Sequence, residues 1–443
     1  MIFKKSISSL KLPHLKGTSG KASVRLAPPP EVFLPTTMHS GDPAVPTVQV
    51  GDHVLVGQLI ASEGARNSCP LHATVSGTVK SIEPYGKGQI ICISSDGKME
   101  KDPSLCEHTA EDLDGFLKLV HESGVVGLGG AAFPVWAKLA AAQKNHIDTV
   151  LINGAECEPY ITSDDRMMIE HPDLIAKGIS LIRQFMGSEH FIIGIEENKP
   201  EAIAKLTELF KDEPDVQVMP LGSVYPQGAK QVLLYNATGK VVGPGQRLAS
   251  LGVIIINVSS LAKMAEYFTT GMPLVEKTLT VEGTAVKEPK NVTVPIGTPI
   301  RYVLEQAGGL VCDPGKVIFG GLMMGKTQDN LDSPVIKATN AIVVMKPEDS
   351  VTPEETPCIH CGRCVEICPL NLNPTAFSKA LEIEDEEERY KLLTKTQVLL
   401  CMQCGCCSYV CPAHRPLAST NKEAMGFVKK INAAKKAAEG GNK

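Results

Sequence analysis

The chain has 443 residues, enough for about three domains of ordinary size. Its formal net charge of −5 gives no case for nucleic-acid binding. No apolar run reaches the length of about 18 residues that spans a bilayer, so we expect no transmembrane segment in this chain. The basic start lacks a long apolar stretch and is a poor secretory signal, and the 14 cysteines show no disulfide pattern, which favours a reducing cytoplasm.

The N-terminal third divides into an extended arm, residues 1–30, and a β-rich module, residues 31–105. A run of three prolines ends the arm. Short apolar runs separated by glycine turns then predict strands, in a pattern that resembles the barrel-sandwich fold of lipoyl and biotinyl domains. Its hairpin segment, EGARNSCPLH, has no lysine to carry such a cofactor. We therefore interpret the module as structural or docking, with Cys69 as a bystander.

A glycine loop follows an amphipathic helix predicted at 111–123. Gly127, Gly129 and Gly130 precede a helix predicted from Pro134 to Ala142, and such a loop brings backbone N–H groups to an anion. A tight helix–helix turn is the alternative, because the spacing is not that of a dinucleotide-binding fingerprint.

The next predicted strand, 149–152, runs into an acidic segment that contains Asn153, Glu156 and Glu158. Ligands bind at the carboxyl ends of strands in open α/β sheets, so this segment is a candidate nucleotide site, although a solvated acidic loop has the same composition. Later strands are predicted at 191–195, 216–221 and 253–258, and helices at 169–186 and 199–211. Their alternation predicts an α/β domain over 111–270.

Residues 275–346 alternate apolar and polar side chains and resemble a β-grasp domain, interpreted as a spacer without a ligand. A short helix is predicted at 300–307 and a strand at 338–345. Between them lies a loop rich in glycine and methionine, residues 319–330. Core packing is the favoured role of Met323 and Met324, because methionine fills gaps in cores.

Two cysteine runs near the C-terminus have the spacing C-x2-C-x2-C-x3-C-P, which is typical of proteins that hold two [4Fe–4S] clusters. The fourth cysteine of each run ligates the other cluster in such proteins. This predicts one ligand set of Cys358, Cys361, Cys364 and Cys411, and a second of Cys401, Cys404, Cys407 and Cys368. A zinc site needs only four ligands, and disulfides need an oxidising compartment, so both are less favoured.

The same region, 350–420, is predicted to be a helical ferredoxin domain, with one helix over 375–400 between the cysteine runs. A basic tail, 421–443, follows as a fraying helix or as a strip that contacts an anionic membrane surface or a partner. Cys406 is interpreted as a spare thiol.

The order of motifs GLGGAAFP, a lysine four residues later, NGAECEP and YPQG resembles the FMN- and NADH-binding subunit of respiratory complex I, over about residues 115–265. With the N-terminal module and the cysteine runs, the whole chain resembles the RnfC family of Rnf-type ion-translocating ferredoxin:NAD oxidoreductases. The resemblance implies that FMN contacts Gly127, Gly129, Gly130, Lys138, Asn153, Glu156, Cys157, Tyr225, Gly228 and Asn257. It implies that Phe133 and Glu158 contact NAD(H). The chain departs from complex I at Ala155, Ala229 and Lys230, where complex I subunits carry acidic residues.

These observations predict a multidomain α/β protein with a barrel-sandwich module, a Rossmann-like FMN/NADH domain, a β-grasp domain and a helical two-cluster ferredoxin domain. The resemblance implies a peripheral subunit on the cytoplasmic side of the cell membrane, bound to other subunits of a membrane-embedded electron transport complex. It would exchange electrons between NAD(H), FMN and two [4Fe–4S] clusters, with no side-chain base required. Two alternatives stay open: a flavin and iron–sulfur cobalamin reductase, and a non-catalytic iron–sulfur conduit.

Overall fold

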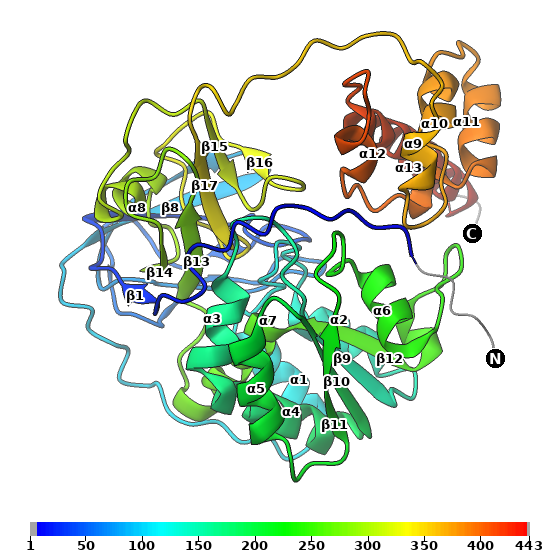
Figure 1. Ribbon diagram of the computed structural model, residues 1–443. Helices are drawn as coiled ribbons and strands as arrows, with labels where there is room; N and C mark the ends of the chain where they lie inside the picture. The colour runs from blue at the N-terminus through cyan, green and yellow to red at the C-terminus, as the bar shows by residue number, and fades with distance from the viewer. Residues whose placement is uncertain (1–6, 441–443) are drawn as a thin grey trace. The chain divides into compact units, whose positions relative to one another are not determined.

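The computed structural model describes residues 7–440 of the chain (Figure 1). Residues 1–6 of the predicted arm and 441–443 of the predicted basic tail lie outside the described residues. The chain divides into two compact units, each with its own hydrophobic core. The first unit comprises Met1–Pro13, Ser223–Gln246 and Val351–Lys443, and the second unit comprises His14–Gly222 and Arg247–Ser350.

The β-rich module of the second unit contains two antiparallel sheets. One has the order β2-β8-β7-β4 and the other β3-β5-β6. The strands are β2 (Glu31–Pro35), β3 (Val45–Pro46), β4 (His53–Val54), β5 (Leu59–Ser62), β6 (Leu71–His72), β7 (Gly77–Tyr85) and β8 (Gly88–Ser95). In β2, Val32 and Leu34 are fully buried and alternate with half-buried positions, the period expected of a strand with one face on a core.

A parallel sheet in the order β11-β10-β9-β12 forms the centre of the second unit, with helices packed around it (Figure 1). Its strands are β9 (Thr149–Gly154), β10 (His190–Glu196), β11 (Val216–Leu221) and β12 (Val253–Asn257). The helices are α1 (Leu113–Glu122), α2 (Val135–Ala142), α3 (Ser163–Glu170), α4 (Pro172–Met186), α5 (Pro200–Leu209), η1 (Leu248–Leu251) and α7 (Val258–Thr270). The two inner strands are continuous apolar runs because helices cover both faces of a parallel sheet.

Sequence periodicity placed the start of one helix of this domain too early and missed two others, α3 and α7. The helix predicted over 169–186 corresponds to α4, which begins at Pro172, and α3, which ends before His171, was not predicted. Proline lacks an N–H and disfavours a helical conformation in the residue before it, so it begins α4 instead of extending α3. Helix α7 was not predicted; Asn257 caps it by accepting a hydrogen bond from the Ser260 N–H.

The third sheet of the second unit has the order β1-β14-β13-β17-β15-β16. Its elements are β1 (Val24–Arg25), β13 (Glu276–Glu282), β14 (Lys290–Pro295), α8 (Ile300–Gln306), β15 (Lys316–Phe319), β16 (Lys326–Thr327) and β17 (Ala341–Met345). Strand β1 comes from the predicted arm and pairs with β14, and Arg25 forms an ion pair with Glu276 on β13. The described part of the arm in this unit is thus built into the fold.

The first unit is helical. Its elements are α6 (Lys230–Thr238), α9 (Arg363–Glu366), α10 (Pro374–Leu381), α11 (Glu386–Lys395), η2 (Val398–Leu400), α12 (Cys406–Tyr409) and α13 (Leu417–Gly440). The single helix predicted over 375–400 is wrong, because the chain is not helical between α10 and α11. Asp385 caps the start of α11 by accepting a hydrogen bond from the Glu388 N–H. Apolar side chains of α10, α11 and α13, among them Phe377, Leu393 and Val428, form its core.

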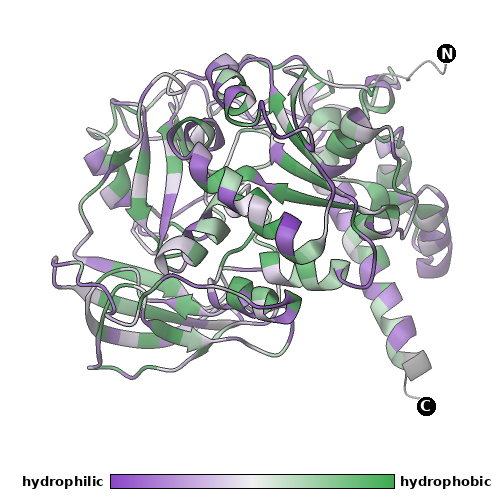
Figure 2. Ribbon diagram, turned by 90° about the horizontal axis from the view of Figure 1, so that it is seen from below, coloured by the Kyte–Doolittle hydropathy of each residue, from purple (hydrophilic) through white to green (hydrophobic). Residues whose placement is uncertain are grey.

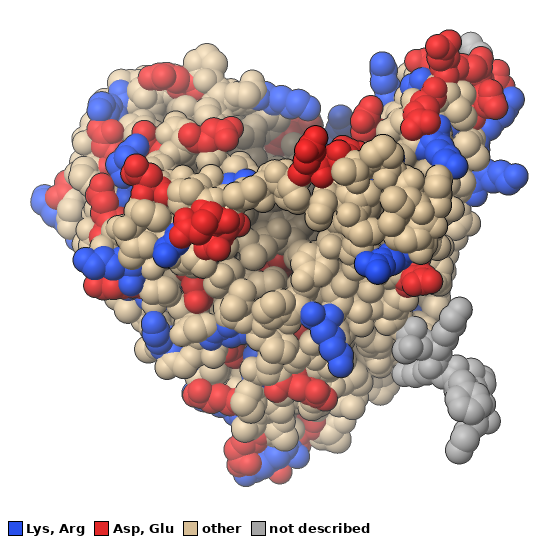
Figure 3. Space-filling model, turned by 45° about the horizontal axis from the view of Figure 1, so that its top comes forward, with Lys and Arg blue, Asp and Glu red and all other residues tan. Residues whose placement is uncertain are grey.

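The distribution of side chains agrees with these cores. Figure 2 shows mostly hydrophobic strands and helices with mixed hydropathy. On the face drawn in Figure 3, acidic and basic side chains are interspersed, as expected for a chain with a small net charge. Within residues 7–440, no helix combines the length and apolar character needed to cross a bilayer.

Candidate functional site

The glycine loop between α1 and α2 is closed by its own backbone. The N–H of Gly127 donates to the Phe133 carbonyl at 2.8 Å, and the N–H of Ala132 donates back to the Gly127 carbonyl at 3.0 Å. Two residues from elsewhere in the second unit hold Leu128: the Ser260 hydroxyl accepts from its N–H at 2.8 Å, and Lys277 Nζ donates to its carbonyl at 3.2 Å. The loop is therefore a backbone turn fixed from within and from neighbouring elements.

The predicted asparagines lie at the carboxyl ends of two neighbouring strands. Asn153 of β9 pairs in register with Asn257 of β12. Asn257 Nδ2 donates to Asp164 Oδ2 at 2.8 Å, and a Cβ at Gly129 would lie 3.1 Å from the same nitrogen. Glycine at 129 thus leaves bare backbone beside an amide side chain at the sheet edge where α/β proteins bind ligands. These features fit a flavin phosphate or ring edge.

Two lysines approach this region. Lys138 of α2 donates to the Ile255 carbonyl of β12 at 2.7 Å. Lys277 is buried, and burial lowers the pKa of its amine to about 8. The sequence prediction included Lys138 but missed Lys277, because a lysine in an alternating strand is usually assigned to the solvent side.

The acidic segment after β9 is not a solvated loop. Glu156 is buried, and its carboxylate accepts hydrogen bonds from the N–H groups of Asp164 (2.8 Å) and Asp165 (3.4 Å) and from the Ser163 hydroxyl (3.2 Å). These donors form the first turn of α3, where a negative charge is favourable. Burial, and then the neighbouring Asp164, raise the pKa of Glu156 to about 7.

Glu158 contacts the glycine- and methionine-rich loop. Its carboxylate accepts from the N–H groups of Met323 and Met324, both at 2.9 Å, and burial raises its pKa. A Cβ at Gly321 would clash with the Glu158 carboxylate, so only glycine allows this contact. The core-packing role expected for Met323 and Met324 is wrong, because Met324 is 54% exposed and Met323 is only half-buried.

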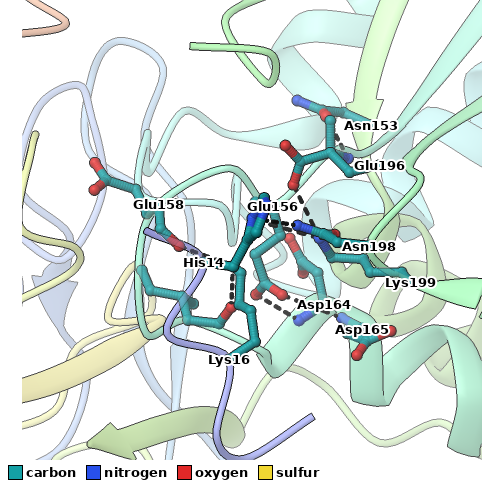
Figure 4. Close-up of polar contacts among 12 residues, drawn as sticks. His14, Lys16, Asn153, Glu156, Glu158, Asp164, Asp165, Glu196, Asn198 and Lys199 are labelled. Atoms are coloured by element: carbon teal, nitrogen blue, oxygen red, sulfur yellow. Dashed lines mark hydrogen bonds and ion pairs between the residues drawn. The ribbon is translucent and has the colours of Figure 1, made fainter. Parts of the chain in front are cut away.

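Two lysines, buried Lys199 and half-buried Lys16, contact the backbone of residues 156–161 (Figure 4). Lys199, which directly precedes α5, pairs with Glu196 of β10 at 2.9 Å and donates to the Glu156 carbonyl at 3.4 Å. Lys16 donates to the carbonyls of Glu156 and Glu158 from the other side. Sequence reasoning missed both lysines, because nothing in the local sequence marks them as buried.

Each of the remaining residues predicted to contact flavin or nucleotide belongs to one of the two units. In the second unit, Phe133 is exposed and Cys157 is half-buried. Tyr225 and Gly228 belong to the first unit. There Tyr225 is buried, and its hydroxyl donates to the Cys404 carbonyl at 2.7 Å, a contact that the sequence did not suggest.

The cysteines of the first unit fall into two groups, and each group combines cysteines of both runs. The electrostatic neighbours of Cys364 are Cys411, Cys361 and Cys358. Those of Cys407 are Cys404, Cys401 and Cys368. Within residues 7–440, no set of three metal-binding side chains is arranged to chelate a single ion.

A cavity beside the second group has the lining that a cluster requires. Cys368, Cys401, Cys404 and Cys407 line it together with apolar residues and Asn421. Asn421 Nδ2 lies 3.6 Å from Cys401 Sγ and 3.8 Å from Cys407 Sγ, and the Leu372 N–H donates to Cys368 Sγ at 3.3 Å. Such donors to sulfur tune a cluster when it is bound.

Family models match successive parts of the chain. Residues 5–98 match the RnfC barrel sandwich hybrid domain, and 120–266 match the Nuo51 FMN-binding domain. Residues 278–327 match the SLBB domain, and 343–414 match the 4Fe-4S dicluster domain. The predicted cofactor classes, FMN and two [4Fe–4S] clusters, are confirmed at the level of these domains.

Curated relatives decide the family. The chain is 39% identical over 371 residues to the RnfC subunit of the Na(+)-translocating ferredoxin:NAD(+) oxidoreductase complex of Acetobacterium woodii, covering 82% of this chain and 84% of the relative. It belongs to the RnfC family. The corresponding subunit of a proton-translocating complex from Clostridium ljungdahlii is also 39% identical, over 84% of this chain and 83% of its own. An RnfC relative from Pectobacterium carotovorum is 36% identical over 84% of this chain and 51% of its own length.

A solved structure supports the fold. The chain resembles an NAD+-reducing [NiFe]-hydrogenase in the air-oxidized state with a TM-score of 0.50 and 19% identity, over 72% of this chain and 62% of that one. At this identity the likeness concerns the fold alone. The predicted family and the mixed α/β, multidomain organisation are confirmed, and the exact domain limits given above stay predictions.

Proposed function

We propose that this RnfC family member exchanges electrons between NAD(H), FMN and two [4Fe–4S] clusters within a membrane-bound, ion-translocating ferredoxin:NAD oxidoreductase complex. The observation that carries the proposal is the glycine loop beside Asn257 at the carboxyl end of the parallel sheet, within the segment matched by an FMN-binding domain. When bound, FMN takes a hydride from NADH and releases single electrons, as one-electron clusters require.

The chain's own residues would bind and orient the flavin. Gly127, Gly129 and Gly130 give close access to backbone, and Asn153 and Asn257 provide amides at the strand ends. Lys138 contributes positive charge from α2. Glu156 fixes the position of α3, and Cys157 follows it in the same segment. Tyr225 and Gly228 belong to the proposed set through the family resemblance.

Phe133 and Glu158 are the proposed contacts for NAD(H). Phe133 is an exposed aromatic side chain beside the glycine loop, suitable for stacking on a planar ring. The Glu158 carboxylate accepts two backbone hydrogen bonds, so its orientation is fixed, and a carboxylate accepts hydrogen bonds from ribose hydroxyls. No side chain has to act as a general base, so these residues would act through binding.

The cysteine groups are the proposed cluster ligands. Cys358, Cys361, Cys364 and Cys411 would hold one [4Fe–4S] cluster, and Cys401, Cys404, Cys407 and Cys368 the other. Their electrostatic neighbours support this exchange between the runs. Cys406 is buried in the second run and is proposed to stay free of iron.

The finer fold labels and the cellular setting are part of the proposal. Parallel strand pairing supports a Rossmann-like flavin domain, and the third sheet with α8 supports a β-grasp domain. The helices around the cysteines support a helical ferredoxin domain. The subunit would be peripheral, on the cytoplasmic side of the cell membrane, bound to other subunits of the complex. The family assignment favours this function over a cobalamin reductase.

The test is flavin reduction by NADH in the anaerobically purified full chain. NADH should bleach the flavin absorbance of the FMN-loaded protein and then reduce its iron–sulfur absorbance. Lys138→Ala removes a positive charge near the glycine loop, and we expect the FMN dissociation constant to rise about tenfold, which corresponds to about 1.4 kcal/mol. Lys144→Ala is the control, because Lys144 is exposed just after α2.

The outcomes separate the alternatives. Intact clusters with bound FMN that NADH does not reduce would indicate a non-catalytic conduit. Intact clusters without any FMN binding would refute the proposed function. If Lys138→Ala and Lys144→Ala change the FMN dissociation constant equally, Lys138 does not belong to the proposed FMN site.

A further inference from the structure

A segment from the N-terminal part of the chain crosses the acidic loop that follows β9. Lys16 Nζ donates to three backbone carbonyls of that loop: Glu156 at 2.7 Å, Glu158 at 2.8 Å and Ile161 at 2.6 Å (Figure 4). These acceptors are about 140 residues away along the chain. An ammonium group has three N–H donors, so the three carbonyls use its full donor capacity.

The flanking residues of the crossing segment make further contacts to the same part of the unit. The Thr18 hydroxyl lies 2.6 Å from the Thr162 hydroxyl, and Arg166 Nη1 donates to the Ser19 carbonyl at 3.0 Å. Thr18 is completely buried. The segment is therefore fixed against the end of the loop and against α3, and Lys16 does not simply lie in solvent.

The charges around Lys16 come from several elements. Burial lowers its pKa, Lys199 lowers it further, and Glu156 and Glu196 oppose that change. Lys199, the residue before α5, also donates to the Glu156 carbonyl. The backbone at Glu156 is thus held from two sides by two lysines that no flavin or nucleotide motif contains.

The loop held in this way carries the residues proposed to meet the cofactors. Cys157 lies in sequence between Glu156 and Glu158, whose carbonyls both accept from Lys16. The Glu158 carboxylate is fixed separately by the N–H groups of Met323 and Met324. Lys16 therefore restrains the backbone of Glu158 and the Met323–Met324 loop restrains its side chain.

We propose that Lys16 is a positioning residue for NAD(H) binding, because its three hydrogen bonds fix the backbone that carries Cys157 and Glu158. This inference rests on the proposed function. It adds a part of the site that comes from the N-terminal segment, outside the region 120–266 matched by the FMN-binding domain. Lys16 itself need not touch the nucleotide.

The test compares Lys16→Met and Lys16→Arg in the full chain. Methionine keeps the side-chain length without donors, and arginine keeps the charge but spreads its donors over a planar fork. We expect both variants to raise the KM for NADH about tenfold, while kcat changes less than about twofold, because ground-state binding is lost. Lys21→Met is the matched control, since exposed Lys21 donates to only one carbonyl, that of Pro289.

A second readout does not depend on catalysis. Hydrogen–deuterium exchange of the protein without FMN or NADH should become faster at residues 156–161 in Lys16→Met and stay unchanged in Lys21→Met. If Lys16→Met is poorly folded, Thr18→Val loosens the same crossing, and we expect a smaller rise in KM of about threefold, as for one lost hydrogen bond.

Each result decides the proposal. If hydrogen–deuterium exchange at residues 156–161 is the same in Lys16→Met as in wild type, Lys16 does not restrain this backbone. If Lys16→Arg keeps the wild-type KM for NADH, the positive charge of Lys16 matters and its three hydrogen bonds do not. Either result would overturn the proposal. A fall in kcat at constant KM would also overturn it. If wild-type protein is not reduced by NADH, the proposed function fails, whereas the exchange measurement still decides whether Lys16 restrains the loop.

Discussion

The two units assemble their candidate sites in different ways. In the first unit, all eight proposed ligands come from two short runs, residues 358–368 and 401–411. In the second unit, the site depends on the glycine loop, two strand ends, Lys16 and the loop at Met323. Ligand spacing along the chain determines the first site. Hydrogen bonds between distant segments determine the second, so each unit should respond differently to substitution.

The largest expected effect is on iron content, and it tests whether the fourth cysteine of each run ligates the cluster of the other run. Cys368→Ser and Cys411→Ser should each remove one cluster, because each replaces one of its four thiolates. Iron and sulfide per chain should therefore fall by about half in either variant. Cys406→Ser is the control and should keep full iron content, because Cys406 lies outside the repeated spacing.

Double substitutions sharpen this prediction. Cys368→Ser combined with Cys401→Ser should lose no more iron than either change alone, because both cysteines would serve one cluster. Cys368→Ser combined with Cys358→Ser should lose nearly all of it. The reverse pattern would mean that each run holds its own cluster, contrary to the contacts of Cys364 and Cys407.

The difference between local spacing and contacts of distant segments also explains which parts of the molecule could be predicted from the sequence. The cysteine sets and the buried strands were predictable because spacing and continuous apolar runs are local signals. The break before Pro172 also had a local signal that the periodicity masked. Lys16, Lys199 and Lys277 could not be found in this way. A lysine in an extended segment normally points to solvent, and only the folded chain shows that these contact carbonyls or carboxylates.

The second unit should show its buried charges in the pH dependence of stability. The pKa of Glu156 is raised from 4.5 to about 7 by burial and Asp164. A carboxyl with a raised folded-state pKa contributes stability below its unfolded pKa and loses it as the pH rises through the folded value. Wild-type stability should therefore fall relative to Glu156→Gln between about pH 4.5 and pH 7, by at most about 3 kcal/mol.

Trp136 makes this measurement specific to the second unit. It is the single tryptophan of the chain and lies on α2, so its fluorescence during urea unfolding reports on that unit. Glu201→Gln, at an exposed position of α5, is the control and should follow the wild-type pH profile. If the urea midpoints of the wild type and of Glu156→Gln change equally with pH across this range, the pKa of Glu156 is not raised in the folded protein.

The smallest effect tests whether a tertiary contact matters in the unit dominated by local spacing. Tyr225→Phe removes the hydroxyl that donates to the Cys404 carbonyl at 2.7 Å, and leaves the ring in place. We expect the first unit to lose about 1 kcal/mol, the usual net contribution of one hydrogen bond. The measurement is the urea concentration at which anaerobic protein loses half of its iron–sulfur absorbance.

Tyr409→Phe is the control for that substitution, because Tyr409 is 57% exposed in the same unit. A lower midpoint in Tyr225→Phe alone would show that the segment 223–246 stabilises the second cysteine run, although 179 residues separate Tyr225 from Cys404. Equal midpoints would mean that cysteine spacing and iron suffice to hold this run. If Tyr225→Phe loses iron even without urea, the cluster site of the first unit depends on contacts between distant segments, as the site of the second unit does.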